Sequence, residues 1–223
     1  MKEIKNDINK SNTNEIKIRK DFFNLYKDSP IVDDEVLNNL GLFINRQNLS
    51  RIIFMHNMYQ NIININGVVM EFGVRWGQNL SLFQNFRGMY EPFNHTRKII
   101  GFDTFEGFPS VDEKDGSSEF ATVGAYSVTK KYDEYLNKIL EYHEKDSPIS
   151  HLKKYEIVKG DASITLEKYL KNNPQTIIAL AYFDFDVYEP TKKCLELIKG
   201  RLGKGSVIGF DELNFSEFPG ETI

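Results

Sequence analysis

The chain has 223 residues, of which 40% are hydrophobic, and a formal net charge of -4 at pH 7. This length supports one substantial core, so we expect a single α/β domain with a small helical appendage and not two full domains. The charge gives no electrostatic footprint for nucleic acid, and the apolar runs are far shorter than the roughly 20 residues of a membrane span.

Other global features narrow the class of protein further. Met1 is followed by charged and polar residues and not by a signal-peptide core, so we expect a cytoplasmic protein that binds neither nucleic acid nor membrane. The only cysteine is Cys194, which excludes an internal disulfide framework and a cysteine-based zinc site.

Residues 1–64 are predicted to form an N-terminal helical segment. Apolar residues recur there at helical spacing over residues 22–63, with no alternating strand pattern. Residues 2–20 are charged and rich in asparagine, which favours a frayed start.

Residues 65–223 are predicted to form a Rossmann-like α/β domain. Five short apolar runs each carry an acidic residue at or near their end: 67–73, 98–103, 155–161, 176–184 and 205–211. Helix-length segments such as 163–171 and 189–200 separate them, which predicts a parallel sheet covered by helices on both faces. Ligands bind such sheets at the carboxyl ends of the strands, where these acids lie.

Residues 107–150 interrupt this alternation and are too long for a simple crossover, so we predict an insertion or lid over the strand ends. Tyr126 and Tyr132 are candidates there for binding an acceptor. His143, in a helix predicted around residues 132–144, is the histidine that we would test as a general base.

The first cofactor motif is the loop formed by Glu71, Gly73, Val74, Arg75 and Gly77. Its two glycines let the backbone turn tightly beneath a ligand, while the next helix presents free N–H groups. The loop does not follow the G-x-G-x-x-G dinucleotide pattern. It follows the E/D-x-G-x-x-x-G pattern of methyltransferases, which favours S-adenosylmethionine over NAD, with a purely structural glycine turn as the alternative.

Two further strand ends complete a predicted cofactor site. Asp103, followed by Thr104, closes the second run, where a carboxylate can accept both ribose hydroxyls of an adenosyl group. Asp161, followed by Ala162, closes the third run and can approach the adenine amino group or cap the next helix, and both roles can hold together.

The fourth and fifth strand ends carry a predicted metal site made by Asp184, Asp211 and Glu212. Acids at the ends of adjacent strands can converge on a hard cation such as Mg²⁺, which would position an acceptor oxygen and lower its pKa. Asp184 and Asp211 are thereby also catalytic candidates, and Asp184 borders the cofactor. The pattern of Asp184 and Asp186 also occurs in glycosyltransferases that bind a nucleotide sugar through a metal, so that class is an alternative.

Taken together, the segments 71–77, 100–109, 173–184 and 210–213 resemble the macrocin O-methyltransferase family, over roughly residues 50–223. The resemblance implies Mg²⁺-assisted transfer of a methyl group from S-adenosylmethionine to a sugar hydroxyl, usually on a nucleotide sugar or a glycosylated natural product, by a protein that often forms homo-oligomers. It implies the cofactor and metal roles given above for these positions. The family commonly has Asp-Asp where this chain has Asp211 and Glu212, so the metal geometry differs from the family pattern.

The end of the chain leads to further expectations. After Asp211 a complete fold of this type has another helix and an antiparallel strand pair, so we expect the last C-terminal strands to be lacking and an uncovered sheet edge to favour association. Besides the glycosyltransferase, two functional alternatives remain: a methyltransferase for another small polar or phosphorylated cell-surface precursor, and an inactive, truncated cofactor-binding domain.

Overall fold

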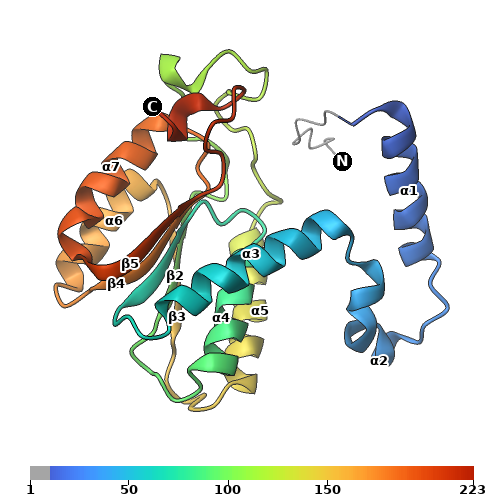
Figure 1. Ribbon diagram of the computed structural model, residues 1–223, viewed down its shortest axis with the longest axis horizontal. Helices are drawn as coiled ribbons and strands as arrows, with labels where there is room; N and C mark the ends of the chain where they lie inside the picture. The colour runs from blue at the N-terminus through green and yellow to red at the C-terminus, as the bar shows by residue number, and fades with distance from the viewer. Residues whose placement is uncertain (1–10) are drawn as a thin grey trace. The chain divides into compact units, whose positions relative to one another are not determined.

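The computed structural model describes residues 11–223 (Figure 1). Its helices are α1 (Thr13–Lys27), α2 (Asp33–Val36), α3 (Arg46–Ile62), α4 (Gln78–Tyr90), α5 (Tyr132–Asp146), α6 (Ala162–Asn172) and α7 (Tyr188–Ile198). The 3-10 helices are η1 (Leu37–Phe43), η2 (Glu113–Asp115), η3 (Lys199–Arg201) and η4 (Pro219–Glu221). The strands are β1 (Val68–Phe72), β2 (Ile99–Asp103), β3 (Tyr155–Lys159), β4 (Ile178–Phe183) and β5 (Leu202–Phe210). Within the described residues, no helix is both long enough and apolar enough to cross a bilayer.

The described residues form two compact units that divide within α3, after Ile53, and not at residue 64 as predicted. The second half of α3 belongs with the sheet because Met55 and Tyr59 are completely buried in its core. The first unit is helical, as predicted. Helix α1 starts with a capping box between Asn12 and Glu15, so the frayed start expected for residues 2–20 is wrong from residue 13 onward. Residues 2–10 of that prediction lie outside the described residues.

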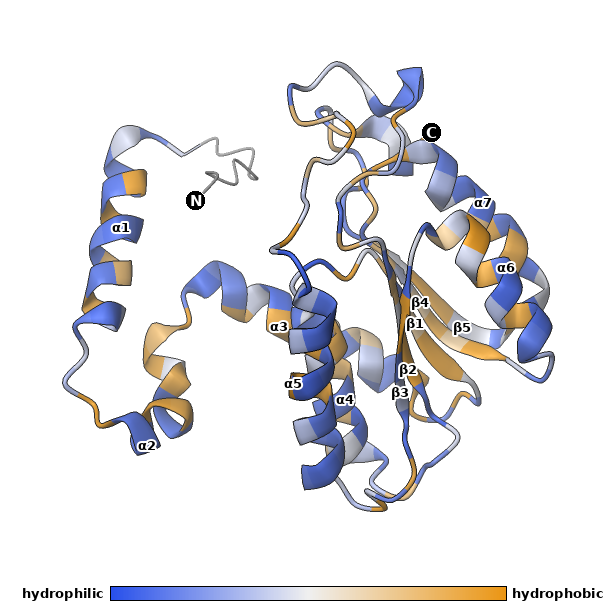
Figure 2. Cartoon of the chain, turned by 180° about the vertical axis from the view of Figure 1, so that it is seen from behind, coloured by the Kyte–Doolittle hydropathy of each residue, from blue (hydrophilic) through white to orange (hydrophobic). Residues whose placement is uncertain are grey.

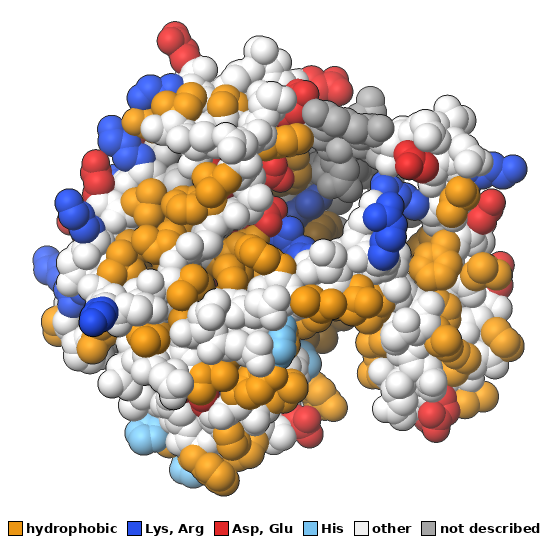
Figure 3. All heavy atoms as spheres, viewed as in Figure 1, with side chains coloured by type: hydrophobic (Ala, Val, Ile, Leu, Met, Phe, Trp, Pro, Cys, Tyr) orange, Lys and Arg blue, Asp and Glu red, His pale blue; other side chains and the backbone are white. Residues whose placement is uncertain are grey.

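The N-terminal unit has an exposed apolar surface. None of residues 11–53 is buried, and many of its large hydrophobic side chains are open to solvent, Leu37 with 76% of its surface. Figure 3 shows these side chains on the surface of the helices of this unit. Burial of apolar area is the main force that stabilises a fold. These exposed side chains therefore contribute little to stability in the single chain.

The second unit contains a parallel sheet with strand order β3-β2-β1-β4-β5. Each of the five predicted apolar runs forms a strand, and β5 begins at Leu202, earlier than predicted. The α/β, Rossmann-like architecture is therefore confirmed. In this order β1 is central, between β2 and β4, and β5 pairs only with β4 among the described residues.

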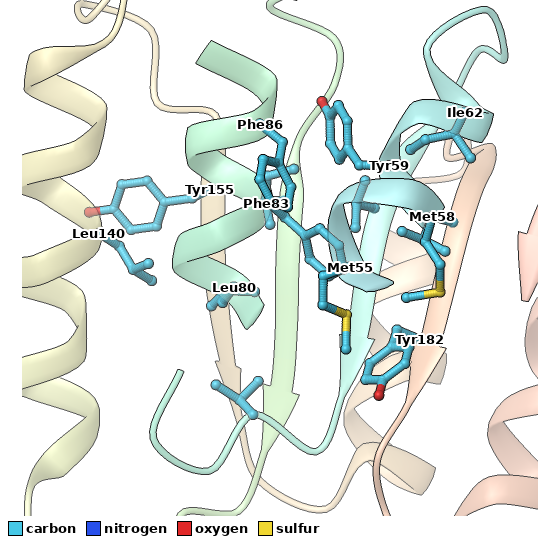
Figure 4. Close-up of a cluster of buried hydrophobic side chains, with 14 of the residues drawn as sticks. Met55, Met58, Tyr59, Ile62, Leu80, Phe83, Phe86, Leu140, Tyr155 and Tyr182 are labelled. Carbon is cyan, nitrogen blue, oxygen red and sulfur yellow. The ribbon is translucent and has the colours of Figure 1, made fainter. Parts of the chain in front are cut away.

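Helices cover both faces of the sheet, α3, α4 and α5 on one and α6 and α7 on the other (Figures 1 and 2). Alternate strand residues point to opposite faces. Val69 and Tyr182 join the cluster beneath α3, α4 and α5, which Figure 4 shows with the α3 side chains. Phe72 and Phe183 stack on the other face at a centroid distance of 4.6 Å. The strands read as continuous apolar runs because both faces are buried.

The structure divides the predicted lid of residues 107–150 into two parts. Helix α5 is a crossover helix of the core layer and not a lid, because Leu136 and Leu140 are buried in the core cluster. Residues 107–131 do reach the carboxyl ends of the strands: the Tyr126 ring lies 5.0 Å from the guanidinium of Arg75. That segment is the part for which a covering role remains a prediction.

Candidate active site

The predicted acids lie together because the parallel hydrogen-bond ladders continue past the strand ends. The backbone N–H of Asp184 donates to the Phe72 carbonyl at 2.8 Å, and that of Asp211 donates to the Phe183 carbonyl at 3.0 Å. Phe183 and Phe210 are partners in the β4–β5 register, so Asp184 and Asp211 follow adjacent residues on neighbouring strands. The sheet thereby brings both to one edge.

The glycine loop is held tightly against this edge. Gly73 has φ +90, and a Cβ added to it would lie 2.0 Å from the backbone carbonyl oxygen of Asp184, so only glycine fits. Gly77 has a left-handed conformation at the start of α4, where no side chain caps the helix. The first N–H groups of α4 thus face the strand ends and can bind an anionic group. Glu71 is a buried residue of β1 itself, just before the loop.

Asp103 ties this loop to the end of β2. Its Oδ2 accepts hydrogen bonds from the backbone N–H groups of Val74 at 2.6 Å and Arg75 at 2.7 Å, and its Oδ1 accepts from Phe105. Burial raises the pKa of the Asp103 carboxyl, although these hydrogen bonds act in the opposite direction. A carboxylate offers about four acceptor positions, so three are used by the backbone and about one remains for a ligand in this conformation.

The end of β3 carries the other predicted cofactor residues. Asp161 caps α6, with its Oδ1 accepting from Ser163 N–H at 2.8 Å, and Ala162 is the buried first residue of that helix. Thr104 is engaged locally, because its hydroxyl donates to the Gly107 carbonyl at 2.7 Å. A cavity of about 270 Å³ adjoins Asp161 between the starts of α6 and α7. It is lined by Pro109, Ser110, Asp161, Ser163, Glu189, Pro190 and Lys193.

Acidic side chains gather at the ends of β4 and β5. Burial raises the pKa of Asp186 well above its ordinary value, and the negative charges of Asp184, Glu221, Glu212 and Asp211 raise it further. The four charged groups that raise this pKa are all carboxylates, so negative charge is concentrated here. We call these five carboxylates the acidic cluster.

Tyr182 and Glu221 orient members of the acidic cluster. The hydroxyl of the fully buried Tyr182 donates to Oδ1 of Asp211. The Glu221 carboxylate accepts from backbone N–H groups after both β4 and β5. Sequence reasoning missed Glu221, because an acid near the end of the chain, outside any strand, has no local signal that places it here.

The acidic cluster fits Mg²⁺ in the chemistry of its donors, since this ion prefers carboxylate oxygens. Within residues 11–223, however, no group of three or more Asp, Glu, His or Cys side chains is already arranged around one point to hold a metal. Binding by Asp184, Asp211 and Glu212 therefore requires side-chain rotation, and Mg²⁺ stays a prediction.

The structure separates His143 from the other predicted residues. It lies in the last turn of α5, next to Glu144, whose carboxylate accepts from the backbone N–H of Lys154 just before β3. This is the amino end of the strands, whereas the other candidates lie at their carboxyl ends. The expectation of a histidine base in a lid helix is thus not supported by the geometry.

The two predicted tyrosines lie near the glycine loop. Tyr132 donates from its hydroxyl to the Trp76 carbonyl at 3.0 Å, and the rings of these residues are 4.8 Å apart. Tyr126 packs against Phe108 and Phe218 as well as near Arg75. Tyr126 thereby contacts the segment just before η4, because Phe218 directly precedes that helix.

Comparisons with known proteins identify the fold and the family. No family model matches the chain, and no curated protein sequence matches it. Among solved structures, CalS11, a calicheamicin methyltransferase, is 42% identical, with a TM-score of 0.93 over 95% of this chain and 83% of that one. A second structure of CalS11, described as a TDP-rhamnose 3'-O-methyltransferase of calicheamicin biosynthesis, is 39% identical with a TM-score of 0.83, over 95% and 84% of the two chains.

A more distant structure supports the fold alone. The O-methyltransferase NovP is 18% identical, with a TM-score of 0.57 over 78% of this chain and 68% of that one. The glycosyltransferase alternative is wrong, because the solved structures that match at high identity are methyltransferases. The chain belongs to the family of O-methyltransferases that includes CalS11, in agreement with the resemblance of its motifs, and is an enzyme of that class.

Proposed function

We propose that this enzyme transfers a methyl group from S-adenosylmethionine to a hydroxyl of a sugar carried on a nucleotide. The observation that carries the proposal is the 42% identity to CalS11 over 95% of the chain, since CalS11 is described as acting on TDP-rhamnose. The arrangement of the strand ends supports it. The glycine loop, the ribose-binding candidate Asp103 and the acids after β4 and β5 all lie at the same edge of the sheet.

The cofactor would occupy the half of this edge formed by β1, β2 and β3. Gly73, Val74, Arg75 and Gly77 would shape the floor beneath it, and the uncapped start of α4 would face its carboxylate. Asp103 would accept a ribose hydroxyl through its remaining acceptor position. The second ribose hydroxyl would need another partner or a shift of the glycine loop, because three backbone N–H groups already use the carboxylate.

The adenine would lie at the end of β3. Asp161 would accept from its amino group through the oxygen that does not cap α6, and Ala162 would pack beside the ring. The cavity next to Asp161 supports this position, because it opens between the starts of α6 and α7.

The acceptor would lie over β4 and β5, where Asp184, Asp211 and Glu212 would hold Mg²⁺. When bound, the ion supplies a positive charge that makes the acceptor hydroxyl more acidic. Asp184, Asp211 and Glu212 would thereby orient the acceptor oxygen toward the methyl carbon. The hydroxyl proton would leave to solvent water, and the new C–O bond would form as the C–S bond of the cofactor breaks, with the electron pair of that bond staying on the sulfur of the S-adenosylhomocysteine product. Proximity and electrostatic stabilisation would then provide most of the catalysis.

We also propose that the chain associates with itself and works in the cytoplasm. Self-association is supported by the N-terminal unit, whose described residues include none that is buried. Exposed apolar surface of this extent is typical of protein interfaces. Sedimentation of the purified chain would test this part: a monomer at micromolar concentration would contradict it.

The experiment that tests the function has two stages. The first is calorimetric titration with S-adenosylhomocysteine, with and without Mg²⁺, where micromolar binding is expected and no binding by folded protein would refute the cofactor. The second is incubation with S-adenosylmethionine and a panel of TDP-sugars, free sugars and phosphorylated sugars, followed by mass spectrometry. Methylation of phosphorylated sugars alone would favour a cell-surface precursor, and no transfer to any member would favour the inactive domain.

A further inference from the structure

We propose that Glu221 is a positioning residue that holds together the loops that follow β4 and β5, so that Asp184, Asp211 and Glu212 can bind one cation. The inference rests on the proposed function for the identity of the ligand. The contacts that support it are independent of that function.

Glu221 bridges the two loops through both of its carboxylate oxygens. Oε1 accepts from the backbone N–H groups of Phe185 at 3.0 Å and Asp186 at 3.3 Å, directly after Asp184. Oε2 accepts from the backbone N–H of Glu212 at 3.2 Å. One side chain is thus bonded to the loop after β4 and to the loop after β5, and the two loops carry all three predicted cation ligands.

Burial of a carboxylate at this position is costly. Only 7% of the Glu221 surface is exposed, and burial together with the nearby charge of Asp211 raises the pKa of its carboxyl to about 7. Hydrogen bonds from the three backbone N–H groups act against that cost. An apolar side chain would fill the space without charge repulsion, so the value of a carboxylate here lies in its bonds to the loops.

Glu221 is itself held in place by the packing of η4. A Cβ added to the preceding Gly220 would lie 2.4 Å from Oδ1 of Asp115 and 2.7 Å from the backbone nitrogen of Tyr188. That same Oδ1 of the buried Asp115 accepts from Tyr188 N–H at 2.6 Å. The chain thus passes close to the start of α7 with no room for a side chain at position 220, and this packing places Glu221 beside the two loops.

This arrangement matters because a small cation requires its ligands at nearly fixed distances. The parallel ladder sets the position of the first residue after each strand, but Asp186 and Glu212 lie beyond it and follow their loops. Asp186 has a left-handed backbone, with φ 62, and its own N–H and that of Phe185 both donate to Glu221. Loss of the bridge frees both loops to move apart under the repulsion of their carboxylates.

The test compares Glu221→Ala and Glu221→Gln with the wild type and with Glu196→Ala, a change at an exposed position of α7. Calorimetry would measure the affinity for Mn²⁺ alone and for S-adenosylhomocysteine alone. We expect Glu221→Ala to bind Mn²⁺ at least tenfold more weakly, with S-adenosylhomocysteine affinity within twofold of wild type. Glu221→Gln should fall between the two, because its single carbonyl oxygen can accept from only one of the loops, and Glu196→Ala should match wild type.

Equal loss of affinity for both ligands would overturn the inference, because it would show a general structural role, and so would unchanged Mn²⁺ affinity in Glu221→Ala. If Glu221→Ala does not fold, the same criteria apply to Glu221→Gln. If the wild type binds no Mn²⁺, the metal part of the proposed function fails. Hydrogen exchange of the backbone N–H groups then tests whether Glu221 holds the two loops together. Faster exchange at Phe185, Asp186 and Glu212 in the variants supports this role, and unchanged exchange refutes it.

Discussion

Asp103→Asn tests the link between the glycine loop and the cofactor. The carboxylate accepts three backbone hydrogen bonds, two on Oδ2 and one on Oδ1. An asparagine has one carbonyl oxygen, so its NH₂ group must face either Phe105 N–H or the N–H groups of Val74 and Arg75. At least one hydrogen bond to a charged acceptor is lost, and such bonds contribute about 1.5–3 kcal/mol.

The bond that Asp103 would accept from the ribose hydroxyl loses its charged acceptor as well. Since a bond of this kind contributes about 1.5–3 kcal/mol and about 1.4 kcal/mol corresponds to a tenfold change in affinity, S-adenosylhomocysteine should bind about 10- to 100-fold more weakly. Calorimetric titration measures this change, and the thermal midpoint shows whether the variant is folded. Asp146→Asn is a matched control, because Asp146 is exposed at the end of α5, at the other edge of the sheet. A folded Asp103→Asn protein with wild-type affinity would refute the proposed role of Asp103.

Three further changes test other parts of the structure. Burial raises the pKa of Glu91, but hydrogen bonds from Arg97 and two other side chains outweigh it and lower the pKa below 4.5. Glu91 therefore stabilises the fold above about pH 4.5 and loses this effect as the pH falls through the lowered pKa. Urea unfolding across this range should show a loss of stability in the wild type and a weaker pH dependence of stability in Glu91→Gln. Gly73→Ala should abolish binding of S-adenosylhomocysteine and lower the thermal midpoint, because its Cβ would meet the carbonyl oxygen of Asp184 at 2.0 Å; normal binding would show that the loop can move. Asp211→Asn should reduce turnover far more than cofactor affinity, and equal losses measured by kinetics and calorimetry would count against the metal role.

The acids at the strand ends were predictable because strand signals are local. An apolar run followed by Asp103, Asp161 or Asp184 can be recognised within a few residues, and the parallel sheet then requires these ends to share one edge. The glycine spacing of residues 71–77 was equally local.

Helix α5 shows where local signals fail. The sequence predicts a helix there correctly, but residues 107–150 are too long for a simple crossover, which suggested a lid. Only the burial of Leu136 and Leu140 shows that the helix packs in the core layer. The direction of the helix places His143 at the amino end of the strands, away from the other candidate residues. Periodicity predicts a helix without stating which element it contacts.

The sequence by itself determined the order of strands and helices, the family and the acids that close the strands, because each depends on neighbouring residues. Only the tertiary structure shows that the Asp103 carboxylate accepts most of its hydrogen bonds from backbone N–H groups, and that Glu221 joins the loops after β4 and β5. The Glu221 contacts to Phe185 and Asp186 span 36 and 35 residues along the chain. Such contacts arise from packing that brings distant segments together, and no local pattern of residue types encodes them.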